Sequence, residues 1–367
     1  MSLKRDNFSI KEKRFMKLAL NLASERIGLT GNNPSVGCII VKNDEIISTG
    51  QTSVNGRPHA EANAISGSNK KNLNNASMYV SLEPCSHYGK TPPCTKLIIK
   101  SKIKKIYYAI DDEDKRSSKK AYPIFRKNNI LVKRYLLLNQ AKKLYESYFH
   151  NRSKEYPYII GKIACSKDNF ISSNKRNITN IHSRNVSHLL RYKNQGILVT
   201  VKTCNKDNSL LNCRLNGLEN YSPIRFLLDK NLSIHKKSNL VKTAKEYKTY
   251  IFFNRENYQK KNYLTKSGIK LIKCDLNKKK QLNIESILRK IKKLNINYLL
   301  VEGGKIFTYS MLKNNLFNEF YLFKSNMILK NKGKDKISKI LFFLNKTFKN
   351  KKKIITYLDN DKIIKYY

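Results

Sequence analysis

The sequence predicts a chain of two α/β domains joined near residue 155. Its 367 residues exceed what a single hydrophobic core usually serves, and short apolar strands alternate with helices through both halves. The polar segment from Arg152 to Pro157 lies between the halves and is typical of a linker. We therefore expect a first domain over residues 1–151, with a largely parallel sheet, and a second domain over residues 156–367.

The first half begins with an amphipathic helix. Ser9 and Glu12 have the spacing of a capping box, and apolar residues follow from Phe15 to Ala23 at helical spacing. Asn43-Asp44 is a hairpin turn signal. The same reasoning predicts strands over 36–41, 45–49, 77–82 and 105–110, and helices from His59, over about 94–100 and over about 141–151.

The second half alternates in the same way. We expect strands over 158–165, 196–201, 224–228, 249–253, 298–301, near 320–323 and over 354–358, with helices over 284–294 and 306–313. Glu302-Gly303-Gly304 lies between a predicted strand and a predicted helix. Glycines at such a position let backbone amides approach a phosphate, although a simple tight turn is an open alternative.

Two short segments supply the side chains of a zinc site. His59-Ala60-Glu61 gives an imidazole and a carboxylate, and the stretch from Pro84 to Cys94, P-C-S-H-Y-G-K-T-P-P-C, gives two thiols. A catalytic zinc takes three protein ligands and leaves the fourth position to water. H-x-E followed by P-C-x-x-C is typical of zinc-dependent nucleobase deaminases, but here eight residues separate the cysteines. We predict His59, Cys85 and Cys94 as ligands.

Glu61 is the predicted catalytic residue. Zinc lowers the pKa of a bound water from about 15.7 to about 7, which makes a nucleophile available at neutral pH. A carboxylate beside that water can pass its proton to a ring nitrogen and then to the departing amine. We expect His59 and Glu61 in the first turn of one helix. Cys94, after Pro92-Pro93, is expected at the start of another, where the helix dipole favours a thiolate.

Two other interpretations of these segments remain open. A structural zinc usually takes four protein ligands, and His87 is a residue that could supply the fourth. Free cysteines are also often buried as small apolar side chains without any metal.

The formal net charge of +48 favours anionic partners. A nucleic-acid surface should gather its basic residues on one face, whereas these lysines are spread along the whole chain. We therefore interpret the charge as a compositional bias that attracts phosphorylated small molecules, and we expect no nucleic-acid partner.

The composition also predicts a cytoplasmic location. No apolar run approaches the roughly 18 residues of a membrane span, and the charged N-terminus is unlike a signal peptide, so no membrane partner is expected. The seven cysteines are an odd number and do not suggest a disulfide framework. A zinc site with thiolate ligands fits a reducing compartment.

The zinc segments closely resemble those of the bifunctional riboflavin-biosynthesis deaminase/reductase family. The resemblance is carried by P-H-A-E upstream of the long cysteine segment, by Gly50 to His59 as the G-x(7)-P-H approach, and by Asn33 to Gly37 as the N-P-x-V-G substrate loop. It runs nearly end to end. It implies a cytidine-deaminase-like three-layer domain followed by a dihydrofolate-reductase-like α/β domain, and it assigns Asn33 to substrate binding.

In the second half the resemblance implies contacts to NADPH and to substrate. Lys162, Ser166 and Asp168 resemble the K-x-x-x-S-x-D opening of the reductase, and residues 203–214 resemble its T-x(3)-D-x(3)-L-x-x-R run. Lys175 and Asn177 replace the usual serine and tryptophan. The implied cofactor contacts are Ala164, Asn177, Thr203, Asp207, Gly303 and Gly304, and the implied substrate contacts are Lys175, Arg191, Leu211, Arg214 and Glu302.

The resemblance implies two reactions on a phosphorylated pyrimidine. The first is zinc-dependent deamination of 2,5-diamino-6-(5-phosphoribosylamino)pyrimidin-4(3H)-one, and the second is NADPH-dependent reduction of the ribosyl chain to give 5-amino-6-(5-phosphoribitylamino)uracil. Zn²⁺ and NADPH are the implied cofactors, and a homo-oligomer is expected. Two alternatives remain: a deaminase whose second domain is non-catalytic, and a deaminase of nucleic-acid bases.

Overall fold

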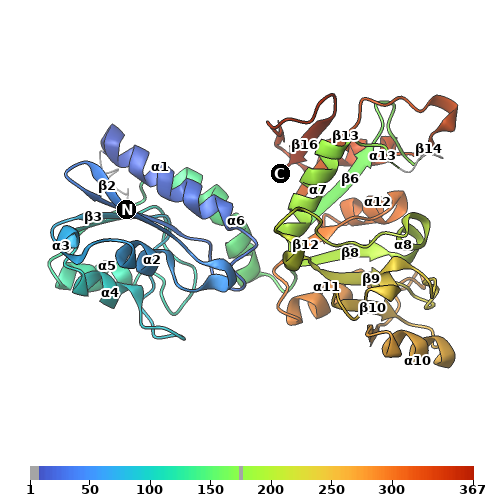
Figure 1. Ribbon diagram of the computed structural model, residues 1–367, viewed down its shortest axis with the longest axis horizontal. Helices are drawn as coiled ribbons and strands as arrows, with labels where there is room; N and C mark the ends of the chain where they lie inside the picture. The colour runs from blue at the N-terminus through green and yellow to red at the C-terminus, as the bar shows by residue number, and fades with distance from the viewer. Residues whose placement is uncertain (1–7, 173–176) are drawn as a thin grey trace. The chain divides into compact units, whose positions relative to one another are not determined.

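The computed structural model describes residues 8–172 and 177–367. It divides into two compact units, Met1–Lys154 and Glu155–Tyr367, which run from blue to teal and from green to red in Figure 1. Within the described ranges, no helix combines the length and the apolar character that crossing a membrane would need.

The first unit contains a five-stranded mixed sheet in the order β2-β1-β3-β4-β5. β1 pairs antiparallel with β2 and with β3, whereas β3, β4 and β5 are parallel. The prediction of a largely parallel sheet is therefore wrong, because the Asn43-Asp44 hairpin begins the sheet with antiparallel strands. The strands are β1 (Gly37–Lys42), β2 (Glu45–Gln51), β3 (Ser77–Val80), β4 (Lys105–Tyr108) and β5 (Leu131–Arg134).

Helices cover both faces of this sheet and form three layers (Figure 1). α1 (Ile10–Glu25) contacts α6 (Leu138–Ser153) on one face, and α2 (Ala60–Ser66), α4 (Cys94–Lys100) and α5 (Ala121–Lys127) lie together on the other. The short α3 (Lys70–Leu73) and η1 (Val54–Gly56) complete the unit. The predicted capping box begins α1: Ser9 Oγ accepts from the Glu12 amide at 3.1 Å, and the Glu12 carboxylate accepts from the Ser9 amide at 2.7 Å.

α2 lies directly against β2 because Gly50 has no side chain. A Cβ at Gly50 would lie 2.1 Å from the carbonyl oxygen of Ala60 and 2.5 Å from the amide nitrogen of Ala64. His59 is the N-cap of α2, one residue before the first turn in which it was predicted, and Glu61 is in that turn. The contact at Gly50 therefore fixes the start of the helix that carries both residues.

The second unit contains a nine-stranded sheet in the order β11-β10-β9-β8-β12-β6-β13-β16-β15. Its pairings are parallel from β11 to β13, and β16 joins β13 and β15 antiparallel. β7 (Phe170–Ser172) pairs separately with β14 (Lys334–Lys336). The remaining strands are β6 (Tyr158–Cys165), β8 (Gly196–Thr200), β9 (Ile224–Leu228), β10 (Thr249–Phe253), β11 (Lys270–Lys273), β12 (Tyr298–Val301), β13 (Glu319–Lys324), β15 (Lys351–Lys353) and β16 (Lys362–Tyr366).

The strand predicted over residues 354–358 is wrong. The chain forms β15 before this segment and β16 after it, and Ile355 is 98% exposed. The pairing of Phe323 with Ile363 places Ile363 in the core instead. The apolar residues of 354–358 gave a local strand signal, but pairing with β13 decides which segment joins the sheet.

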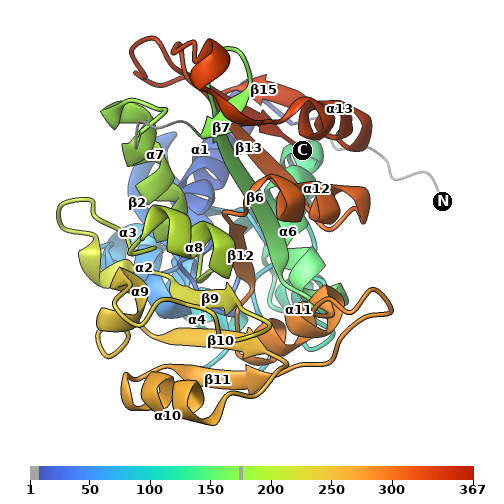
Figure 2. The ribbon, with the colours of Figure 1, turned by 90° about the vertical axis from the view of Figure 1, so that its right-hand side faces the viewer.

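Two cores lie on the two faces of the nine-stranded sheet (Figure 2). Ile159 and Ile163 of β6 pack with one set of helices, and the alternate residues Tyr158 and Ile160 pack with the other. The first set is α11 (Ile284–Lys293), α12 (Lys305–Lys313) and α13 (Ser338–Thr347); the second is α7 (Ile181–Tyr192), α8 (Val201–Asp207), α9 (Asn239–Lys242) and α10 (Tyr258–Lys266). The 3₁₀ turns are η2 (Glu219–Tyr221) and η3 (Lys330–Lys332).

Arg225 of β9 is a fully buried guanidinium. It donates hydrogen bonds to four carbonyl oxygens and two threonine hydroxyls, and its burial lowers its pKa to about 10. These bonds connect β9 to residues 240–249 and to the Leu210 carbonyl. The Arg225 side chain therefore holds the backbone at Leu210, directly before the 211–214 segment.

Replacing Gly50 by alanine should destabilise the first unit by about 1–3 kcal/mol, because the added methyl group overlaps backbone atoms of α2. Urea unfolding of the full chain measures the change. Gly67→Ala is the matched control, since a Cβ at Gly67, at the other end of α2, would meet its nearest atoms at 3.3 Å. Equal stability of the two variants would contradict the assigned contact.

Candidate active sites of the two units

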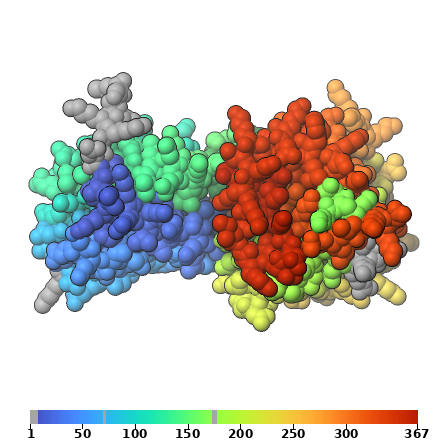
Figure 3. All heavy atoms as spheres, turned by 90° about the horizontal axis from the view of Figure 1, so that it is seen from above, coloured from blue at the N-terminus to red at the C-terminus, as the bar shows by residue number. Residues whose placement is uncertain are grey.

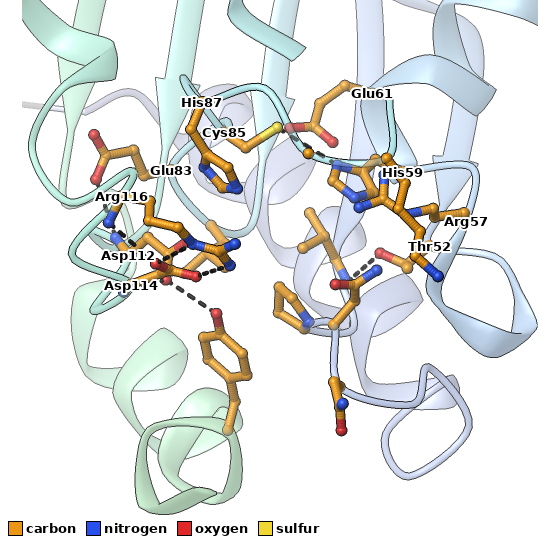
Figure 4. Close-up of a pocket in the computed structure, with 18 of the residues that line it drawn as sticks. Thr52, Arg57, His59, Glu61, Glu83, Cys85, His87, Asp112, Asp114 and Arg116 are labelled. Atoms are coloured by element: carbon orange, nitrogen blue, oxygen red, sulfur yellow. Dashed lines mark hydrogen bonds and ion pairs between the residues drawn. The ribbon is translucent and has the colours of Figure 1, made fainter. Parts of the chain in front are cut away.

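The first unit brings His59, Cys85 and Cys94 together. Their ligand atoms all lie within 4.8 Å of one another. His59 Nδ1 is 3.6 Å from Cys85 Sγ and 3.4 Å from Cys94 Sγ. His59 is the N-cap of α2, Cys94 is the first residue of α4, and Cys85 lies in the loop after β3. Figure 4 shows His59 and Cys85 facing a common space beside Glu61.

The chemistry of this cluster fits a zinc ion. Two sulfurs and one imidazole nitrogen are a ligand set that zinc prefers. The backbone amide of Cys94 donates to Cys85 Sγ at 3.3 Å, which favours the thiolate form that a metal requires. The Cys94 thiol and His59 also bond to Cys85 and lower its pKa to about 4. The Cys94 pKa rises because its thiol holds the proton of that bond and is buried.

His87 is not part of this cluster in the residues that the structure describes. Its Nδ1 lies 2.7 Å from Ser117 Oγ. The interpretation as a structural zinc with His87 as the fourth ligand therefore has no support in the observed geometry.

Glu61 lies beside the cluster and is only 3% exposed. Burial raises its pKa to about 7, against the opposing influence of the His59 charge. A carboxyl group with a pKa near the working pH can both accept and release a proton. The arrangement therefore suits proton transfer at an atom held next to the three ligands.

These residues open into a pocket of about 520 Å³. Asn33, predicted to bind substrate, lines this pocket, and its amide donates to the Gly56 carbonyl at 2.8 Å. In Figure 4, His59 and Arg57 lie on one side of the pocket, and Glu83, Asp112 and Asp114 lie on the other. The volume accommodates a small heterocycle rather than only water.

Sequence reasoning missed the acidic wall of the pocket. The buried Glu83 carboxylate accepts hydrogen bonds from the amides of Asp112, Lys119 and Ala121 at 3.0, 2.9 and 3.0 Å. Burial raises the Glu83 pKa, and these three bonds oppose that rise. The one local signal was an acidic residue placed directly before Pro84-Cys85. Glu83 thus fixes the loop that carries the rest of the wall.

The wall also contains paired charges. Asp112 accepts from the Tyr148 hydroxyl at 3.2 Å. Asp114 accepts from Arg116 at 2.6 and 3.0 Å and pairs with Arg152 at 3.0 Å. The bonds to Arg116, and next the charge of Arg152, hold the Asp114 pKa below its ordinary value. The pocket therefore presents both hydrogen-bond acceptors and cations to a ligand.

In the second unit, Glu302 is the centre of a buried charge cluster. Arg191 donates two parallel hydrogen bonds to its carboxylate, both at 3.0 Å, and Lys162 Nζ lies 3.9 Å away. Burial favours the neutral acid, but the charges of Arg191 and Lys162 prevail and lower the Glu302 pKa to about 2. Burial also lowers the Lys162 pKa. The cluster keeps Glu302 ionised.

Asn212, which sequence reasoning did not single out, holds both predicted substrate arginines. Its backbone carbonyl accepts from Arg191 at 3.2 Å, and its side-chain oxygen accepts from Arg214 at 2.8 Å. Leu211 precedes it with a positive φ of 58°, which is uncommon for a branched side chain. Strained backbone of this kind persists where the surroundings impose it, often at functional sites.

The predicted cofactor residues are only partly brought together. A Cβ at Gly304 would lie 3.2 Å from Thr203 Oγ1, so these two residues are neighbours. The charges of Lys162 and Glu302 act on Asp207, which places it near the Glu302 cluster. Gly303 accepts from Thr308, and Ala164 faces Phe323 across β6 and β13. Asn177 is exposed, with no described contact to this cluster, and Lys175 lies outside the described residues.

Two family models match the chain, one in each unit. Residues 9–110 match the cytidine and deoxycytidylate deaminase zinc-binding region, and residues 157–351 match the RibD C-terminal domain. The first match contains the His59, Cys85 and Cys94 cluster, and the second contains the Glu302 cluster. The fold is thus a cytidine-deaminase-like domain followed by a reductase domain of the dihydrofolate-reductase type.

Relatives resemble the chain over most of its length. The riboflavin biosynthesis protein RibD of Aquifex aeolicus is 35% identical over 87% of this chain and 88% of its own, and that of Bacillus amyloliquefaciens is 33% identical over 87% and 85%. A diaminohydroxyphosphoribosylaminopyrimidine deaminase/5-amino-6-(5-phosphoribosylamino)uracil reductase of Thermotoga maritima is 29% identical, covers 96% and 97% of the two chains and superposes with a TM-score of 0.79. The chain therefore belongs to the RibD family of bifunctional deaminase/reductases of riboflavin biosynthesis.

Proposed function

We propose that this chain performs both reactions named for its Thermotoga relative. The first is hydrolytic deamination of 2,5-diamino-6-(5-phosphoribosylamino)pyrimidin-4(3H)-one, and the second is reduction of the ribosyl chain to give 5-amino-6-(5-phosphoribitylamino)uracil. The single observation that carries the proposal is the convergence of His59, Cys85 and Cys94 beside a buried Glu61.

Zinc and Glu61 account for the deamination. The imidazole and the two thiolates would hold the ion, and a bound zinc would lower the pKa of water and supply a nucleophile at neutral pH. Glu61 takes a proton at its carboxylate, delivers it to the ring nitrogen and then supports departure of ammonia. Its pKa of about 7 suits both directions of transfer. Asn33 and the Asp112 wall orient the ring within the pocket.

The Glu302 cluster supports the reduction. NADPH would supply the reducing equivalent, with Thr203 and the Gly303-Gly304 turn as its proposed contacts. Arg191 and Arg214, held by Asn212, present cations suited to a substrate phosphate. The intact cluster of Lys162, Arg191 and Glu302 favours a catalytic second domain over a purely structural one. A cytoplasmic location, a homo-oligomeric assembly and the absence of a nucleic-acid partner stay predictions.

Mass spectrometry of products tests the two reactions separately. Given the diaminopyrimidinone phosphate alone, the purified chain should release ammonia, and with NADPH the product should also gain two hydrogens. Removal of zinc by a chelator should abolish the first change, and added zinc should restore it. Reduction should survive chelation when the deaminated intermediate is supplied. Ammonia release that persists without metal would refute the zinc site.

Glu61→Gln should lose about 10²- to 10⁴-fold in deamination rate while it retains zinc, since the amide cannot carry the proton. Ammonia release and metal content measure the two effects. Glu45→Gln, at an exposed position of β2, is the control that should keep full activity. Comparable turnover by the Glu61 variant and the wild type would eliminate the assigned role.

Arg191→Lys should raise the substrate KM of the reduction about tenfold or more, because an ammonium cannot make the two parallel bonds to Glu302. NADPH oxidation measures the change, and deamination should be unaffected. Arg184→Lys is the control on the same helix, where the side chain donates to the Thr179 carbonyl rather than to a carboxylate of the site. A KM unchanged by the Arg191 variant would exclude this residue from substrate binding.

A further inference from the structure

Helix α7 is held by a carboxylate at each end. Near its C-terminal end, Arg191 binds Glu302 through two bonds of 3.0 Å. At its N-terminus, Asp361 Oδ2 accepts from the amide of Asn180 at 3.0 Å and from Ser183 Oγ at 2.7 Å. Negative charge at a helix N-terminus also interacts favourably with the helix dipole. The position of α7 is therefore set by residues from two distant parts of the chain.

Asp361 is itself firmly placed. It is 7% exposed and comes directly before β16. β16 in turn pairs with β13 through five residue pairs. Its second oxygen, Oδ1, accepts from the amide of Asn326 at 3.3 Å. One carboxylate thus joins the last strand, the loop after β13 and the start of α7.

Neighbouring contacts reinforce the same junction. Asn180, the N-cap of α7, accepts from the Ser183 amide at 2.9 Å and donates to the Leu358 carbonyl at 2.6 Å. The His182 and Tyr357 rings meet edge to face at 4.7 Å. Figure 3 shows the C-terminal segments in red around the green segment that follows β6 on one face of the second unit.

The C-terminal half of this junction, which includes Tyr357, Leu358 and Asp361, lies beyond the region that the family model matches. The RibD C-terminal domain match ends at residue 351, ten residues before Asp361. Sequence reasoning placed a strand over 354–358 and gave Asp361 no role. Asp361 bonds Asn180 and Ser183, which precede it in the chain by 181 and 178 positions. No local sequence pattern could therefore reveal these contacts.

We propose that Asp361 is a positioning residue for the reductase site. By fixing the N-terminus of α7 against β16, Asp361 determines the position of the helix that carries Arg191 to Glu302. It also determines the position of the backbone that leads from Asn177 into this helix. Asp361 acts through α7 and is not among the residues proposed to contact substrate or cofactor. The inference rests on the proposed reductase function for its consequence in catalysis, but the placement of α7 is testable without any activity.

Hydrogen–deuterium exchange on the full-length chain tests the placement. In Asp361→Ala, amides over residues 180–187 should exchange about tenfold faster or more, whereas amides of β8 and β12 should keep their wild-type rates. Asp361→Asn should show the same pattern to a lesser degree, because one amide oxygen cannot replace two carboxylate oxygens that accept three bonds. Asp359→Asn, at an exposed position two residues earlier, should match the wild type.

Kinetics on the same variants tests the consequence. At temperatures where the second unit stays folded, Asp361→Ala should raise the substrate KM of the reduction about tenfold, with a smaller change in kcat and with ammonia release within about twofold of wild type. A domain that is only less stable would instead lose kcat at constant KM. Unchanged exchange over 180–187 would overturn the proposal. Altered exchange together with an unchanged KM would show that Asp361 places α7 but has no effect on the reductase site.

The two levels of the proposal fail in different ways. A wild-type chain that neither binds nor oxidises NADPH would refute the reductase function, while the exchange pattern would still decide whether Asp361 places α7. A wild-type chain that reduces substrate, together with an Asp361→Ala variant of normal exchange and normal KM, would refute the positioning role alone.

Discussion

The backbone contact between α2 and β2 at Gly50 is the constraint on which the deaminase site depends. It places the N-cap His59 and the first-turn Glu61 at one edge of the sheet. The start of α4 then supplies Cys94, whose amide also bonds Cys85. Three proposed ligands from three segments therefore meet at the starts of two helices, where a backbone amide and the helix dipole favour the thiolate form of Cys85. The positions of His59 and Glu61 therefore depend on the packing of the α2 backbone against β2.

The site of the second unit depends on charged side chains. Its site places Lys162 and Arg191 beside the Glu302 carboxylate, and Arg214 is joined to the same region through Asn212. The Asn212 backbone carbonyl accepts from Arg191. Arg214, which is exposed, adds a cation that an anionic ligand could reach. The strained Leu211 belongs to the same arrangement, because it turns the chain so that Asn212 faces both arginines.

Features that depend on residues close together in the sequence could be predicted, whereas features that depend on contacts between distant residues could not. The proposed zinc ligands lie in two compact segments that can be recognised locally. β6, β9, β10 and β12 are apolar runs with clear boundaries, and local patterns indicated these strands with the observed ends. Glu83 bonds amides 29 to 38 residues away, and Asn212 gains meaning only when Arg191 lies beside it. The last strand was misplaced for the same reason, since its choice depends on pairing with β13. Register between distant strands has no signature within either one.

The buried Arg225 has a consequence for how this sequence can vary. The cations of the chain are mostly lysine, and on a solvated surface the exchange of one for the other costs little. At Arg225 six oxygen atoms surround a planar fork. An ammonium has three donors and a single nitrogen, so lysine there would strand several carbonyls without a proton. Lysine, the commoner cation of this chain, is therefore excluded at this position by geometry rather than by charge.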